Sequence, residues 1–210
     1  MTPMDDPAGE LIRLARNQVG PASEVLTRAF FNDSKLTYIF PDEMERRERA
    51  GHLFGFELRY GMRYGRVYAT SPHLEGLAVW LPSGKSEITS WRAFRSGALK
   101  LQKGLGKETM SRLLAFSDLV DKFHKKHAPD PHCYLFFLGV DPAFQGRGWA
   151  GRLLAPVLLE LERKKIPCYL NTQNERNIPL YEHFGFQVIE QVTLPGTGIV
   201  HTGMIRKPIA

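Results

Sequence analysis

One stretch of about forty residues constrains the fold more than any other part of the chain. An uninterrupted apolar run, Cys133 to Val140, is followed by a turn that contains glycines, by a helix-like segment from Trp149 to Lys165, and by a second strand-like run at 167–172. A strand, a helix and a strand in this order are typical of two parallel strands joined by a right-handed crossover. The sequence therefore predicts an α/β fold.

The turn between the first strand and the helix has the chemistry of an anion site. The first N–H groups of a helix have no partner inside it, and the helix dipole adds partial positive charge there. Gly146 and Gly148 open the backbone to close approach, and Arg147 and Arg152 add positive charge. We expect a phosphate or pyrophosphate here, although a turn that merely lets strand and helix pack closely is an alternative. The GxGxxG and P-loop patterns of nucleotide-binding proteins do not fit.

Elsewhere the hydrophobic pattern predicts one domain over 1–210, with no repeats or linkers. The expected elements are a helix at 22–32, a loop at 33–42, a long helix at 43–64, an antiparallel hairpin at 66–71 and 74–83, helices at 90–105 and 108–127, a short helix at 177–184 stopped by Gly185, and a closing hairpin at 186–194 and 199–207.

Composition limits the compartment and the partners. The 210 residues are 43% hydrophobic, enough for a core, and the net charge of +6 favours anionic partners such as a phosphate-bearing cofactor or a nucleic acid. No apolar run approaches the roughly 20 residues of a membrane span, and residues 1–10 lack the pattern of a signal peptide. We therefore expect a cytoplasmic protein in which Cys133 and Cys168 are reduced thiols.

Two segments carry a resemblance to a known family. The run 138-LGVDPAFQGRGWA-150 is similar to the acetyl-coenzyme A signature of the GNAT N-acetyltransferases, matched at Gln145, Gly148 and Ala150. The run 174-NERNIPLYEHFGF-186 resembles the second signature of that family, matched at Asn174, Tyr181, Gly185 and Phe186. The LGV-x-P opening, Pro156 in the crossover helix and the N-x-P-x-Y-x-x-x-G-F segment are closest to the puromycin N-acetyltransferase-like subgroup.

The resemblance implies a central twisted mixed sheet flanked by helices, with acetyl-CoA as cosubstrate. It implies an acceptor side in 1–130 and a cofactor-binding and catalytic half in 131–210. The residues expected to contact acetyl-CoA are Leu138, Val140, Gln145, Gly146, Arg147, Gly148, Trp149, Ala150 and Asn174. The pantetheine arm would pair with main-chain groups at Leu138 and Val140, provided that the parallel strands separate there. For Asn174 a helix cap is the alternative, and Asn177 is an even better cap candidate.

The same resemblance assigns the chemistry. A neutral amine attacks the thioester, the N–H of Val140 stabilises the oxyanion, and Tyr181 protonates the leaving thiolate. The general base stays open. Where the puromycin-type subgroup has a Glu in the strand, this chain has Asn171, which would orient a water unless Glu57, Glu75 or His73 takes the proton.

The acceptor is the least defined part. An aromatic or apolar amine would bind near the segment 36–42 and the helix after it, against Tyr38, Phe40, Tyr60 and Trp91, although such residues usually belong to the core. We expect a small-molecule amine. The alternatives are a protein lysine or N-terminus, and a sensor that binds acetyl-CoA without turnover.

Metal and nucleic acid are not expected partners, and a homodimer stays open. His124 and His127 lack a carboxylate or cysteine at matching spacing, and the sequence has no helix-turn-helix or zinc-finger motif.

Overall fold

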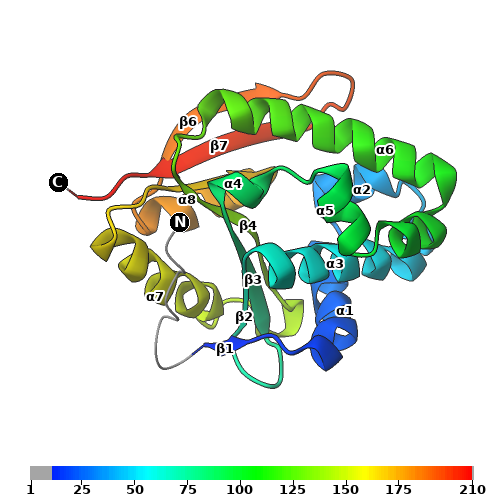
Figure 1. The fold of residues 1–210 in the computed structure, drawn as a ribbon, viewed down its shortest axis with the longest axis horizontal. Coiled ribbons are helices and arrows are strands. Elements are labelled where there is room, and N and C mark those ends of the chain that lie inside the picture. The colour runs from blue at the N-terminus through cyan, green and yellow to red at the C-terminus, as the bar shows by residue number, and fades with distance from the viewer. Residues whose placement is uncertain (1–10, 210) are drawn as a thin grey trace.

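The computed structural model describes residues 11–209, so the leader-like features sought in residues 1–10 lie outside the described residues. Within residues 11–209, seven strands form one mixed sheet in the order β1-β2-β3-β4-β5-β7-β6 (Figure 1). They are β1 Ile12–Arg13, β2 Arg66–Ala69, β3 Gly76–Pro82, β4 Cys133–Val140, β5 Cys168–Thr172, β6 Gln187–Thr193 and β7 Val200–Arg206. Among these described strands only β4 and β5 pair in parallel, which confirms the predicted crossover and the α/β class.

Helices cover both faces of the sheet. They are α1 Val19–Phe30, α2 Ser34–Ile39, α3 Glu43–Tyr64, α4 Ser83–Ser86, α5 Ser90–Arg95, α6 Ala98–His127, α7 Trp149–Arg163 and α8 Ile178–His183, with short 3-10 turns at Arg16–Gln18, Pro142–Phe144 and Glu175–Asn177. One core cluster joins α1, α3 and α6 to one face, and the second joins α7 and α8 to the other. Figure 1 shows α6 crossing the molecule above β6 and β7 toward α2 and α5.

The long helix α3 has the predicted bounds in spite of its glycines. Gly61 has a packing reason, because a Cβ atom there would lie 2.6 Å from Cγ1 of Val79 and 2.9 Å from Cγ2 of Val67. The glycine thus lets α3 lie directly on the sheet, and this close packing sets the distance between the sheet and the other side chains of the helix.

Two predicted elements are wrong in detail. The segment 33–42 is not all loop, because Asp33 accepts a hydrogen bond from Lys35 N–H and caps the six-residue helix α2. The helix predicted at 90–105 is broken at Gly97, which has a φ of 96°, into α5 and the start of α6. The expected division near 104–108 is a kink at Gly106, with a φ of 75°, inside α6.

Several side chains of uncertain role have structural partners. The thiols of Cys133 and Cys168 are buried, free and adjacent in register. His124 Nε2 lies 2.9 Å from His132 Nε2, and burial lowers the pKa of His124 to about 3, so the ring is neutral. His127 contacts Glu190. Within residues 11–209, no group of three or more His, Cys, Asp or Glu side chains has metal-site geometry, and no helix has the length and apolarity of a membrane span.

Candidate active site

The glycine turn positions the start of α7 as an open set of main-chain donors. Gly146 and Gly148 have φ angles of 73° and 79°, and a Cβ at either position would meet nothing within 4 Å. Backbone conformation therefore requires these glycines, in addition to the close approach predicted from the sequence. Gly148 is the N-cap of α7, and no side chain caps the helix. The first N–H groups of α7 are thus available to an anion.

Side chains around this turn hold it in place. Asp141, at the end of β4, accepts hydrogen bonds from Ala143 N–H at 3.0 Å and from Arg28 Nε and Nη2 at 2.9 and 2.6 Å. Gln145 Nε2 donates to the Val140 carbonyl at 3.1 Å. Arg147 lies over the ring of Phe144. The sequence did not single out Arg28 or Asp141, whose pairing joins residues far apart in the chain.

The two parallel strands separate directly beside this turn. Pairing of β4 with β5 is confined to Cys133–Leu135 and Cys168–Leu170. The bond from Asp141 N–H to Glu75 C=O, at 2.9 Å, sets which β4 residues face β3. By the alternation of an antiparallel pair, Leu138 and Val140 direct their main-chain groups to the opposite side, where β5 no longer pairs. The separation that an added amide arm requires is therefore present.

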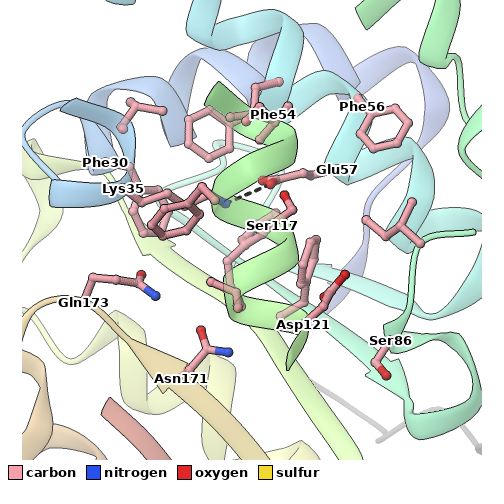
Figure 2. A pocket seen from close by; sticks show the side chains of 18 of the residues that line it. Phe30, Lys35, Phe54, Phe56, Glu57, Ser86, Ser117, Asp121, Asn171 and Gln173 are labelled. Atoms are coloured by element: carbon pink, nitrogen blue, oxygen red, sulfur yellow. Dashed lines mark hydrogen bonds and ion pairs between the residues drawn. The ribbon is translucent and has the colours of Figure 1, made fainter. Parts of the chain in front are cut away.

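A cavity of about 440 Å³ opens from this gap toward the helices. Figure 2 shows its walls, with Lys35 and Glu57 directed toward each other from α2 and α3, Ser117 and Asp121 on α6, and Asn171 and Gln173 on the β5 side. The sheet side of the lining includes Leu138, Asn171 and Tyr181. The cavity thus runs continuously from the strand gap to the space between α3 and α6.

Tyr181 enters the cavity from α8. Its side chain is buried and its ring contacts Phe186 edge to face. Burial, and secondarily the charge of Asp33, raise the pKa of Tyr181 above that of an ordinary tyrosine. The phenol therefore carries its proton at neutral pH and can donate it.

Comparison with known proteins shows that this chain is similar to acetyltransferases. A family model described as an acetyltransferase (GNAT) domain matches residues 108–188. An uncharacterized N-acetyltransferase of Schizosaccharomyces pombe is 25% identical over 181 residues, which cover 82% of this chain and 72% of the relative. Residues 108–188 thus match a GNAT acetyltransferase domain, and the chain is similar to an N-acetyltransferase over most of its length.

Solved structures share the fold. A Corynebacterium glutamicum protein described as histone acetyltransferase HPA2 and related acetyltransferase superposes with a TM-score of 0.67 at 19% identity, over 96% of this chain and 97% of that one. Arylalkylamine N-acetyltransferase 2 from Aedes aegypti superposes with a TM-score of 0.62 at 15% identity, over 94% and 97% of the two chains. The acetyltransferase domain match and the N-acetyltransferase relative support an acyltransferase that depends on acetyl-CoA. The open turn and the strand gap fit a diphosphate and an extended amide arm. Membership of the puromycin-type subgroup stays a prediction.

The two asparagines of the second GNAT signature have different surroundings. Asn174 is exposed and caps the turn Glu175–Asn177 by accepting from Arg176 N–H at 3.1 Å. Asn177, the better cap candidate by sequence, makes no capping bond and lines the cavity. The capping alternative for Asn174 is therefore present, and its contact with the cosubstrate stays a prediction.

The three candidate bases differ in whether they line the cavity. Glu57 lines the cavity. Glu75 is buried elsewhere and accepts from the hydroxyls of Thr70 and Ser71 at 2.8 and 2.7 Å. His73 lies in the exposed turn between β2 and β3. Asn171 donates to the hydroxyl of Tyr134 at 2.9 Å, so it is available as a positioning group at the cavity wall.

The aromatic residues expected at the acceptor side are elsewhere. Phe40 and Tyr60 are fully buried in the core, Trp91 is exposed on α5 against Phe94, and Tyr38 packs on Phe116. Within the described chain the aromatic lining instead consists of Phe30, Phe54, Phe56, Phe116, Tyr134, Phe136, Phe137 and Tyr181. Helical spacing does not distinguish a cavity phenylalanine from a core phenylalanine, because both lie on apolar faces.

Sequence reasoning also missed Asp121. This α6 side chain lines the cavity, and burial raises its pKa to about 6. A signal was available, because Asp121 falls between Phe116, Val120 and His124 on the buried side of α6. A carboxylate on an apolar stripe indicates a polar cavity or a buried pair.

Proposed function

We propose that the protein transfers the acetyl group of acetyl-CoA to a primary amine of a small molecule, by direct attack within a ternary complex. The observation that carries this proposal is the continuous cavity from the β4/β5 gap to the space between α3 and α6. A volume of about 440 Å³ suits a compact molecule that is largely enclosed by protein. Residues 1–130 supply most of the acceptor side, and residues 131–210 supply the cosubstrate side.

The cosubstrate is held mainly by main-chain groups. The pyrophosphate binds the N–H groups of Gln145 to Ala150, with Arg147 adding positive charge and Trp149 lying at the first turn of α7. The arm pairs with Leu138 and Val140, and Asn174 offers an amide to it. Of the two strand residues, Leu138 lines the cavity and Val140 does not. We therefore propose that the N–H of Leu138 donates to the oxyanion. Leu138 lies two residues before Val140, the donor expected from the sequence, and nearer to the acceptor end of the cavity.

Tyr181 protonates the coenzyme A thiolate as it leaves. The phenol keeps its proton in this buried position, and the cavity brings it to the same space as Leu138 and the acceptor. Burial raises the pKa of Tyr181, but the same surroundings also disfavour the thiolate of coenzyme A, so that proton transfer from the phenol to the sulfur is still possible.

Release of thiol from acetyl-CoA, measured over a panel of small amines, tests this function. We expect Tyr181→Phe to lower kcat at least about a hundredfold, the usual range for loss of a general acid, with unchanged acetyl-CoA binding in calorimetry. Tyr38→Phe is the matched control, since Tyr38 packs outside the cavity. Undiminished kcat in Tyr181→Phe would exclude the acid role, and acetyl-CoA binding without transfer to any amine would exclude the small-molecule function.

A further inference from the structure

The cavity contains a carboxylate that the proposed reaction leaves unexplained. Glu57 is only 4% exposed, at the middle of α3. Its Oε1 accepts from Lys35 Nζ at 3.0 Å, whereas its Oε2 is buried without a hydrogen-bond partner in the described chain. A buried oxygen of a carboxylate is costly to leave unpaired. Because Glu57 lines the cavity, a ligand can provide the missing donor.

The remaining charges of the lining favour a cation as that donor. Lys35 is the one Lys or Arg among the described residues that line the cavity, and it is already paired. Asp33 is engaged as the cap of α2, and Asp118 is paired with Lys122 at 2.7 Å near the surface. Asp121 remains directed at the same space. The lining thus has more carboxylates than cations, which favours a ligand that carries positive charge.

The wall beside Glu57 is apolar and aromatic. The rings of Phe30 and Phe54 stack with centroids 5.5 Å apart, and both meet Phe137 edge to face at 6.4 and 6.3 Å. These three residues, which we name the phenylalanine wall, line the cavity together with aliphatic side chains of α6. Figure 2 shows Phe30, Phe54 and Glu57 at the same end of the cavity. Contact between this wall and an apolar ligand stabilises the complex, because both surfaces are removed from water. A polar ligand would lose its water there and find no hydrogen-bond partner.

We propose that Glu57 is the acceptor-binding residue, that its free oxygen binds the ammonium group of the substrate, and that the substrate is a monoamine with an apolar, ring-sized body seated on the phenylalanine wall. This inference rests on the proposed function for its reaction, in which the bound ammonium releases one proton to solvent and attacks as the neutral amine. The proton that its nitrogen loses after attack restores the phenol of Tyr181. The Lys35 pair fixes the orientation of the carboxylate, so that Oε2 is presented to the ligand. Polyamines and amino acids are excluded as good substrates, since the first carry further charges to the apolar wall and the second add a carboxylate beside Glu57 and Asp121.

Four probes test the substrate class: 2-phenylethylamine, propylamine, spermidine and phenylalanine. We expect kcat/KM for 2-phenylethylamine to exceed that for each of the others at least tenfold, because burial of the ring contributes to binding and the added charges oppose it. Equal values for 2-phenylethylamine and propylamine would contradict the apolar seat.

Two variants test the residue. In Glu57→Gln, KM for 2-phenylethylamine should rise at least tenfold with KM for acetyl-CoA within twofold of wild type, because a charge-assisted hydrogen bond to the amine is lost. The double variant Lys35→Met/Glu57→Gln removes both charges and leaves no unpaired lysine, and the same rise is expected. Glu48→Gln, an exposed position on the same helix, is the matched control. An unchanged amine KM in the folded double variant overturns the proposal.

Calorimetry of 2-phenylethylamine with the protein loaded with coenzyme A separates this inference from the proposed function. Binding that Glu57→Gln abolishes, in a protein that acetylates none of the amines, would refute the function and sustain the binding site. Transfer of acetyl groups to amines at a rate that does not depend on Glu57 would support the proposed function and refute the binding site.

Discussion

The two ends of the proposed site are built in different ways. The cosubstrate end is one continuous segment, the end of β4 and the turn into α7, and it presents main-chain groups fixed by Gly146, Gly148 and the Asp141 bonds. The acceptor end is a cavity whose walls come from α1 to α6, β4, β5 and α8, and it presents side chains. Main-chain recognition suits a ligand that never varies, whereas side chains can be exchanged one at a time. Substitutions at the two ends should therefore have separable effects.

The largest expected effect is on the acceptor side. Lys35→Met leaves the buried carboxylate of Glu57 without its cation, and we expect a loss of about 3 kcal/mol in the free energy of unfolding, the low end for a broken buried pair because Lys35 is partly exposed. Urea denaturation measures it. Lys122→Met breaks the exposed pair with Asp118 and should cost less than about 0.5 kcal/mol.

The same variant sharpens the comparison through its ligands. With Lys35 removed, an ammonium ligand replaces the missing cation, so 2-phenylethylamine should raise the Tm of Lys35→Met more than that of the wild type. Coenzyme A should raise both by similar amounts. An equal response to the amine would show that Glu57 does not face the acceptor.

The next effect is at the cosubstrate end. Gly148→Ala places a side chain at a φ of 79°, which costs about 1 kcal/mol of stability and displaces the first N–H groups of α7. We expect acetyl-CoA to bind about tenfold more weakly in calorimetry, since one charge-assisted hydrogen bond is worth that much. Gly84→Ala is the matched control, because Gly84 also has open space around it but no positive φ. Equal losses in the two variants would contradict the role of the turn.

This difference between the ends decides what the sequence could reveal. The turn is contiguous, so strand, glycines and helix appear in order in the chain, and they predicted the fold class and a phosphate site. The resemblance to the GNAT signatures, not the turn itself, implied acetyl-CoA. Glu57 appeared in the sequence only as one of three unranked bases, although its place between Leu53 and Tyr60 on the buried face of α3 was a usable signal. A carboxylate at that position must have a partner, and Lys35, 22 residues away, could not be identified without the fold.

The aromatic residues expected at the acceptor side show more clearly why the sequence alone could not predict the cavity walls. Trp91 and Phe30 both lie in helices, yet the first is exposed and the second lines the cavity. Gly97, with its left-handed conformation, separates α5 from α6 and so sets the direction of α6. The left-handed conformation of a single residue redirects the chain, and no periodicity in the neighbouring helices records it. Cavity walls assembled from many helices and strands depend on several such turns at once.

The smallest expected effect is a pH dependence at Asp121. Burial raises the pKa of this carboxyl to about 6, opposed by Lys125 and reinforced by Glu87 and Asp118. The folded protein therefore holds the proton more tightly than the unfolded chain, whose ordinary value is 3.8, so stability falls as pH rises from about 4 to about 6 and stays lower above that window. Asp121→Asn should remove this fall. The change should stay below about 1 kcal/mol, since water screens a half-buried group.

Denaturation at pH 4.5 and 6.5 measures this effect, with Glu48→Gln, an exposed carboxylate outside the cavity, as the control. The ligands again separate the two ends. An ammonium group in the cavity favours the ionised carboxylate and should move the midpoint of the Asp121 window to lower pH, whereas coenzyme A alone, held at the turn beyond the strand gap, should leave it in place. A shift of the same size with either ligand would mean that the two ends are electrostatically one site, and the separation of roles between main chain and side chains would then be wrong.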